Sequence, residues 1–167
     1  PWENLLGEEG DGLGVIFNVV APTFMLGLSG VNLGIADAAF QTALRHAQSR
    51  KYADGSSLAS LQAIQFYLAE MHGRVESLRL FLYRAAQAAD EGQPEAPLLV
   101  MQSKVQASET AVQVTQTALQ VCGGQGYTRS MPIERYLRDA RASSVMAPTT
   151  EVLKTWVGKS LAGIPLF

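Results

Sequence analysis

The residues best suited to chemistry lie at three places in this chain. A glycine run at 123–126 follows a helical pattern, and glycines let a backbone approach an anion and present its amides to it. The guanidinium of Arg50 is a fork that binds phosphate oxygens in pairs. The Pro-Thr-Thr-Glu run at 148–151 is typical of a helix start, which also favours an anion. Together these are residue types that could bind a ligand that carries phosphate.

Each of these features has a plainer interpretation. A glycine pair after a helix usually ends that helix, and a surface arginine is usually solvated. Glu151 would repel a phosphate lying directly above the same helix start, so it suits a ribose hydroxyl better. The glycines alone are therefore a weak indication of a cofactor site.

Other kinds of site find little support. His46 and His72 are the only histidines, and neither lies in a Glu-x-x-His pattern, which excludes a di-iron bundle; we expect no metal. Cys122 is the only cysteine, so no disulfide framework exists, and we expect a reducing, cytoplasmic location. Its thiol is best interpreted as a small buried apolar group. The net charge of −2 gives no basic surface for nucleic acid.

The elements that must position these residues are all helical. No segment alternates with period two, whereas apolar residues recur every three or four positions over 58–90 and 97–122. Pro132 suits the first turn of a short helix through Arg141, and Thr149 suits the cap of a last helix. The pattern predicts an all-α fold, an up-down-up-down four-helix bundle with one additional short helix at 132–141.

One segment raises the question of a membrane. Residues 12–36 carry no charge over 25 positions, which is long enough to cross a bilayer. Two asparagines, a proline and five glycines argue against a span, and no Lys or Arg flanks it closely. We therefore expect a buried core helix and no membrane, with Pro22 starting or kinking the long helix.

Ordered motifs reveal a family resemblance. The segment 120–127, QVCGGQGY, is followed by Pro-Ile-Glu-Arg at 132–135 and Arg-Asp-Ala-Arg at 138–141. Upstream, QAIQFYLAEM occupies 62–71 and NLLGEEG occupies 4–10. This set resembles the C-terminal helical domain of the acyl-CoA dehydrogenases, which use FAD to desaturate acyl-CoA thioesters. The resemblance implies that residues 1–13 are the tail of a preceding β-domain or linker and that 14–167 form the helical domain. It also implies that the chain is a fragment or has lost most of the family's length.

The resemblance also implies a set of cofactor contacts. In the family, the matching residues touch the FAD diphosphate and adenosine, partly in a neighbouring subunit. The matching positions here are Arg50, Gln62, Gln120, Gly123, Gly124, Thr149, Thr150 and Glu151. Upstream of Gln62, the run Tyr52-Ala53-Asp54-Gly55 replaces a Phe-Gly pair with one extra residue, so we expect an altered loop there.

The chemistry departs from the family at one position. The family's catalytic Glu falls at Ala147, and Pro148 stands where the family has Gly. Some members carry the base on the first long helix instead, but Phe24 and Met25 lie near those positions. We therefore expect no catalytic base in this chain, because removal of an α-proton needs a positioned carboxylate.

Three hypotheses remain open. The chain is the C-terminal domain of an acyl-CoA dehydrogenase-like oxidoreductase, supplying part of an FAD site and an oligomer interface. Alternatively, it belongs to a flavin monooxygenase of the same fold, or it is a helical assembly domain without catalysis. The first hypothesis implies fatty acid metabolism, acyl-CoA as substrate of the full-length parent, and a dimer or tetramer of this chain or a related subunit.

Overall fold

Helices make up nearly all the regular structure of the computed structural model, which describes residues 2–166. A short 3-10 turn, Trp2–Asn4, precedes the first helical run. The helices are α1 (Gly12–Val15), the π-helical segment η2 (Ile16–Val20), α2 (Ala21–Ser49), the 3-10 turn η3 (Leu58–Ser60), α3 (Gln62–Asp90), α4 (Ala96–Tyr127), α5 (Ile133–Val145) and α6 (Thr150–Leu161). Within the described residues there is no strand, and a single isolated bridge joins Lys51 and Ser57. The all-α prediction is confirmed.

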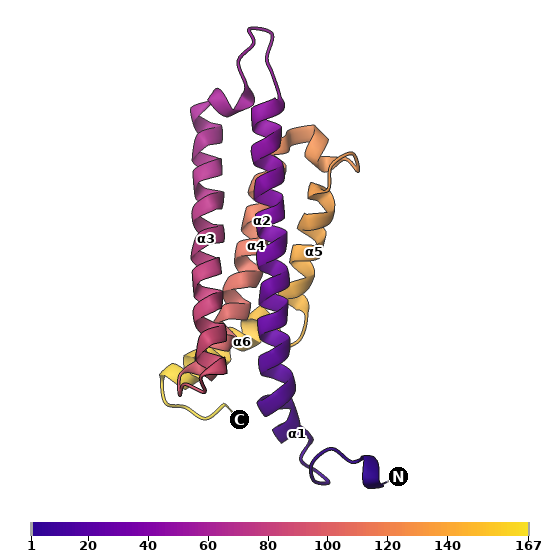
Figure 1. Cartoon of the computed structure of the whole chain (residues 1–167), viewed down its shortest axis with the longest axis vertical. Coiled ribbons are helices and arrows are strands. Elements are labelled where there is room, and N and C mark those ends of the chain that lie inside the picture. Colours follow the sequence, from indigo (N-terminus) through magenta and orange to yellow (C-terminus); the bar gives the residue numbers. More distant parts are fainter. Residues whose placement is uncertain (1, 167) are drawn as a thin grey trace.

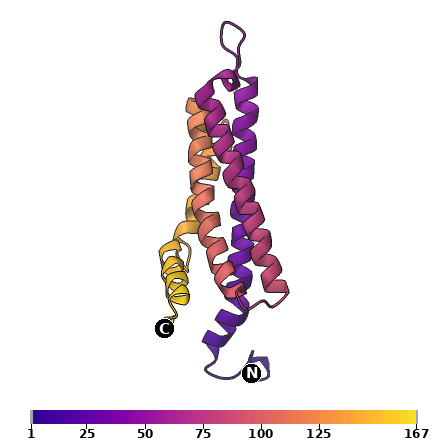
Figure 2. The ribbon, with the colours of Figure 1, turned by 90° about the vertical axis from the view of Figure 1, so that its left-hand side faces the viewer.

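The helices alternate in direction through α2, α3, α4 and α5 (Figure 1). Helix α4 is central, because it packs against α2, α3, α5 and α6. Helix α6 lies outside the four, beside one end of α4 (Figure 2). The additional short helix is thus the last one. The segment predicted for that role forms α5 instead, because Ile133, Ala140 and Ser143 bury one face of it in the bundle.

Alanine explains how closely α2 and α4 pack. Four alanines of α2 and three of α4 are completely buried: Ala36, Ala39, Ala43, Ala47, Ala107, Ala111 and Ala118. Because the alanine side chain is a single methyl group, two helix backbones can approach closely and remain tightly packed. Helix α3 adds Met71, Val75, Leu78 and Leu82 from the predicted stripe to the same core. A second cluster holds α6, with Leu153 and Val157 packed against Val100 and Met101.

The uncharged run at 12–36 differs from the expectation of a buried core helix. Its buried residues all lie in the second half, on one face of α2, whereas Leu13 and Val19 in the first half are 70% and 60% exposed. Figure 1 shows the start of this run projecting past the end of the bundle, and the ring of Phe17 packs against Trp156 of α6 with centroids 5.9 Å apart. Gly12–Ser49 is long and apolar enough to cross a membrane, with a mean hydropathy of 1.7 in its best window. Core helices and signal sequences pass the same test.

Helix boundaries follow the expected residues with one extension. Pro22 lies in the first turn of α2, directly after the π-helical segment, as the sequence predicts. Thr149 caps α6, its hydroxyl accepting a hydrogen bond from the Val152 amide at 3.4 Å. Helix α4 does not end at Cys122. It breaks at Gly123 (φ 57°, ψ −143°) and continues for another turn to Tyr127.

Candidate functional site

The antiparallel topology gathers five of the predicted site residues at one end of the bundle. This upper site consists of Arg50, Gln62, Gln120, Gly123 and Gly124. Arg50 follows the last residue of α2, Gln62 begins α3, and the other three lie in the final turns of α4 (Figure 1). All five are exposed. Residues far apart in sequence therefore share one accessible surface.

The glycines of the upper site leave the backbone open. A Cβ at Gly123 or Gly124 would meet no atom within 4 Å, so nothing in the chain itself fills that space. The positive φ of Gly123 interrupts the helical ladder there. An exposed guanidinium and accessible backbone at the same end of the bundle are the kinds of donor that a diphosphate requires. The residues present therefore fit the phosphate-bearing part of FAD.

The altered loop beside Arg50 is a compact turn. Asp54 Oδ1 accepts hydrogen bonds from the Ser56 amide at 2.9 Å and from the Ser56 hydroxyl at 2.6 Å. These bonds, the hydroxyl first, lower the pKa of Asp54. The Leu58 amide donates to the Arg50 carbonyl at 3.0 Å, which closes the base of the loop. The extra residue predicted here is thus absorbed in the turn, and Arg50 stays next to the start of α3.

A buried histidine lies beneath this end. His46 is 8% exposed, and its Nε2 has no hydrogen-bond partner in the structure. Burial, and then the charge of Arg50, lower the pKa of His46. Its imidazole is thus held in the neutral form near pH 7. The position of His46 in the sequence did not indicate a buried imidazole with an unpartnered nitrogen.

The remaining predicted residues form a separate lower site, made of Thr149, Thr150 and Glu151 at the start of α6. It is separated from the upper site by α5, whose 13 residues span about 20 Å at 1.5 Å per residue. Thr150 is buried, and its hydroxyl faces the Ser144 carbonyl at 3.4 Å. Glu151 is exposed and Thr149 half-buried, so these two are accessible to a ligand. A single diphosphate therefore cannot touch both sites of one chain.

A small polar pocket adjoins the lower site. Its volume is about 220 Å³, and its lining comes from α4, α5 and α6. Glu109, Gln113, Arg141 and Ser144 join Thr150 and Glu151 around it. Sequence reasoning assigned Arg141 a structural role and did not single out Glu109 or Gln113. Glu109 and Gln113 are four residues apart on α4, so the sequence spacing indicates that they lie on the same face of that helix.

A buried lysine was missed entirely. Lys104 is 0% exposed, and its ammonium donates to the carbonyls of Ser143 (2.7 Å), Pro148 (2.9 Å) and Met146 (3.2 Å). Burial lowers the pKa of Lys104, and the charge of Glu151 opposes that shift. The available sequence signal was its spacing, since Lys104 lies three residues after the buried Met101 and so on the core face of α4.

Ala147 lies in the exposed loop between α5 and α6, and its peptide bond to Pro148 is cis. The loop residues 146–149 contain no carboxylate. On α2, Met25 is buried and Phe24 is 38% exposed. Neither side chain carries a carboxylate, so neither can act as the base. The side chains around this loop can hold a substrate or a cofactor but offer no base at position 147.

Metal and thiol chemistry find no support in residues 2–166. No group of three or more His, Cys, Asp or Glu side chains there is placed to hold a metal ion. Cys122 is completely buried, and burial raises the pKa of its thiol to about 11. The interpretation of Cys122 as a small buried apolar group is confirmed.

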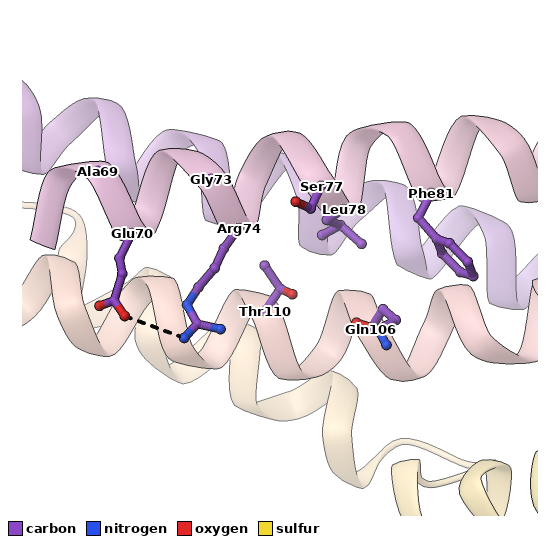
Figure 3. A pocket seen from close by; sticks show the side chains of 9 residues that line it. All are labelled: Ala69, Glu70, Gly73, Arg74, Ser77, Leu78, Phe81, Gln106 and Thr110. Atoms are coloured by element: carbon purple, nitrogen blue, oxygen red, sulfur yellow. Dashed lines mark ion pairs between the residues drawn. The ribbon is translucent and has the colours of Figure 1, made fainter. Parts of the chain in front are cut away.

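Another groove lies along the middle of α3 and α4, away from both ends (Figure 3). It has a volume of about 550 Å³, and small residues of α3 (Ala69, Gly73 and Ser77) leave it open. Arg74 crosses it, reaching Glu70 at 3.9 Å and the Gln113 side chain at 2.7 Å. The side chains that line this groove are those of an ordinary protein surface, and they do not form a catalytic site.

Comparison with known proteins decides the family. Residues 12–162 match the model of the acyl-CoA dehydrogenase C-terminal domain. The chain belongs to the acyl-CoA dehydrogenase family. It is 40% identical over 161 residues to the bovine (Bos taurus) mitochondrial short-chain specific acyl-CoA dehydrogenase, covering 96% of this chain and 38% of that protein.

Solved structures of the family share this fold. Butyryl-CoA dehydrogenase from Megasphaera elsdenii superposes with a TM-score of 0.92 at 34% identity, covering 97% of this chain and 42% of that one. The structure of PigA with FAD and proline superposes with a TM-score of 0.86 at 29% identity, covering 94% and 40%. This acyl-CoA dehydrogenase C-terminal domain thus spans about two-fifths of the length of the relatives it matches.

Proposed function

We propose that this chain is the C-terminal domain of an acyl-CoA dehydrogenase-like flavoprotein and contributes part of its FAD site. The observation that carries the proposal is the upper site, where motif residues of three helices converge on one exposed end. Arg50 would pair with diphosphate oxygens, and the open backbone at Gly123 and Gly124 would approach them. Bound FAD would supply the acceptor for a hydride.

The two sites on one chain support an assembly of subunits. Because α5 separates the upper site from the lower site, the two would serve different FAD molecules or distant parts of one. An FAD completed across a subunit boundary makes self-association part of cofactor binding. The proposed assembly is a dimer or tetramer of this chain within its full-length parent, or a complex with a related subunit.

The chain by itself supplies no base for acyl-CoA desaturation. Ala147 has no proton-accepting atom, and α2 offers no substitute near Phe24 and Met25. We therefore propose that the isolated chain is inactive, and that another subunit supplies the base or the parent acts on another substrate.

Anaerobic bleaching of the flavin by acyl-CoA tests this function in the full-length parent. The Ala147→Glu variant should create or raise bleaching by about 10²–10⁴-fold, the usual contribution of a general base. Pro148 lacks an N–H and fixes φ, so the double variant Ala147→Glu with Pro148→Gly covers a loop of the wrong shape. Rapid bleaching by the unmodified homo-oligomer would contradict the proposed loss of the base.

The missing base also favours a second candidate, a flavin monooxygenase of the same fold, which needs no carboxylate at position 147. Substrate-dependent oxygen consumption by the flavin-loaded parent, without anaerobic bleaching by acyl-CoA, would support this alternative. A parent that binds no flavin would instead support the third possibility, a helical assembly domain.

A further inference from the structure

Lys104 is the one lysine, arginine or carboxylate side chain that is buried among residues 2–166. It projects from the first third of α4 toward the end of α5, more than 35 residues later in the chain. Burying an unpaired ammonium in a protein core is costly, so the fold must compensate it. The groups that stabilise the buried charge therefore indicate the role of the Lys104 side chain.

The ammonium is compensated by backbone carbonyls alone. An ammonium has three N–H donors, and the three go to the carbonyls of Ser143, Met146 and Pro148. Ser143 lies in the last turn of α5 and Met146 caps it, so the charge sits at the negative end of that helix. No carboxylate pairs with Lys104 in the described structure; Glu151 acts on it only at longer range.

These three carbonyls enclose the position where the family carries its base. Met146 and Pro148 are the two neighbours of Ala147, and the same lysine binds both of their carbonyls. The start of the segment is held a second time through its side chain, because the Ser143 hydroxyl meets Asn32 at 2.7 Å and Ser108 at 2.8 Å. Moving the loop would leave the ammonium buried without partners.

We infer that Lys104 is a positioning residue that clamps the loop between α5 and α6, and thereby fixes the direction of residue 147 and the start of α6. Its meaning for catalysis rests on the proposed function; the clamp itself does not. Lys104 is not a replacement base, because its three donors are committed to carbonyls and its nitrogen has no accessible lone pair.

Amide hydrogen exchange in the full-length protein tests the clamp without reference to activity. Met146, Val152 and Leu153 amides are hydrogen-bonded within the clamped segment. In Lys104→Met, exchange over 144–153 should rise about tenfold or more, because hydrogen bonds from a charged donor are among the stronger ones. Exchange in the middle of α2 and α3 should change much less.

Lys154→Met is the matched control. Lys154 lies on α6 close to the same segment, but it is exposed and pairs only with Glu109. This variant should exchange like the unsubstituted protein. Equal acceleration throughout α2, α3 and α4 in Lys104→Met would overturn the inference, since it would indicate general destabilisation. Unchanged exchange over 144–153 would overturn it as well.

A milder variant keeps the test decisive if Lys104→Met does not fold. Lys104→Gln retains two N–H donors on a side chain one atom shorter. It should show a smaller, still local, acceleration over 144–153. Acceleration spread evenly over the chain in this variant would contradict the clamp.

A second comparison separates the clamp from the proposed function. In the flavin-loaded parent, Lys104→Gln should abolish most of the bleaching activity gained by Ala147→Glu, when the rate is expressed per bound flavin. If neither Ala147→Glu nor its double variant with Pro148→Gly gains bleaching while exchange shows local release, the clamp stands and the acyl-CoA desaturation proposed for the parent fails. If the gain persists fully in Lys104→Gln, Lys104 does not position residue 147.

Discussion

Single residues fix the geometry of the upper site through backbone conformation and burial. Gly123 is the clearest case, because its φ of 57° and ψ of −143° lie in a region that other residues enter only with strain. His46 is the second, since an imidazole with an unpartnered nitrogen lies beneath the same surface. A prediction follows for each of these two residues, and substitution of a neighbouring or equivalent residue provides the control.

Replacing Gly123 should destabilise the fold. Gly123→Ala should cost about 1–3 kcal/mol of unfolding free energy from backbone strain. Gly124→Ala is the control, because Gly124 is helical, exposed and has open space for a methyl group, and it should be neutral or slightly stabilising. Urea unfolding of the purified protein measures both. Equal effects of the two substitutions would contradict the assigned backbone conformation.

Acid should destabilise the protein through His46. Its pKa is lowered in the folded state, so below about pH 6.5 the unfolded chain binds a proton that the folded chain resists. The melting temperature should therefore fall between pH 7 and pH 5, and His46→Gln should flatten that dependence. The exposed His72 gives the control His72→Gln, which should keep the wild-type slope. A slope unchanged in His46→Gln would rule out this assignment.

Helices are joined by a buried polar seam as well as by apolar packing. Asn32 of α2 donates to the Ser143 hydroxyl of α5 at 2.7 Å, and Ser108 of α4 meets the same hydroxyl at 2.8 Å. Three helices thus meet at one side chain beside the loop that holds Ala147. Such a seam fixes the register of α5 against the bundle, because a shift would leave buried polar groups without partners.

Removing the shared hydroxyl should be costly. Ser143→Ala should lower the unfolding free energy by about 1–3 kcal/mol, since the Asn32 amide loses an acceptor in the core. The neighbouring Ser144 is less buried and makes no side-chain hydrogen bond in the structure, so Ser144→Ala should change stability by less than about 0.5 kcal/mol. Denaturant midpoints compare them. A Ser143→Ala protein as stable as Ser144→Ala would show that the seam is unimportant.

Elements with strong periodicity could be predicted from the sequence, and contacts between distant backbones could not. The stripe through Met71 and Leu82 determined α3 because apolar spacing alone defines a buried face. The role of Lys104 could not be predicted, because its partners are carbonyls and any sequence supplies those. The sequence also did not indicate whether α5 or α6 fills the fourth position. That depends on which face the bundle buries, and Ile133, Ala140 and Ser143 of α5 are buried there.

The whole molecule exposes a surface that the bundle does not cover. The projecting start of the α1–α2 run carries five apolar side chains that are at least 38% exposed: Leu13, Ile16, Val19, Val20 and Phe24. Exposed apolar surface of this kind marks a site of association with another protein surface. The site residues were predicted because they belong to ordered motifs, whereas their division between two ends of the molecule required the fold.

Studied by itself, the chain should self-associate into a dimer or tetramer. Sedimentation equilibrium should show the larger species, and the double variant Leu13→Lys with Val19→Lys should shift it toward monomer by adding charge to the projecting surface. Gln87→Lys, at an exposed position of α3, should leave the association unchanged. A clean monomer at high concentration would contradict the expected interface.

The affinity of the full-length parent for FAD, compared between two arginine variants, tests the central claim most directly. Arg50 belongs to the upper site, whereas Arg45, five residues earlier on α2, is exposed and donates a hydrogen bond to the Thr42 hydroxyl. Fluorescence titration of apoprotein should show FAD binding weakened about tenfold or more in Arg50→Gln, since a charge-assisted contact is lost. Arg45→Gln should bind as the unsubstituted protein does. A parent without affinity for FAD, or equal affinities in the two variants, would contradict the account.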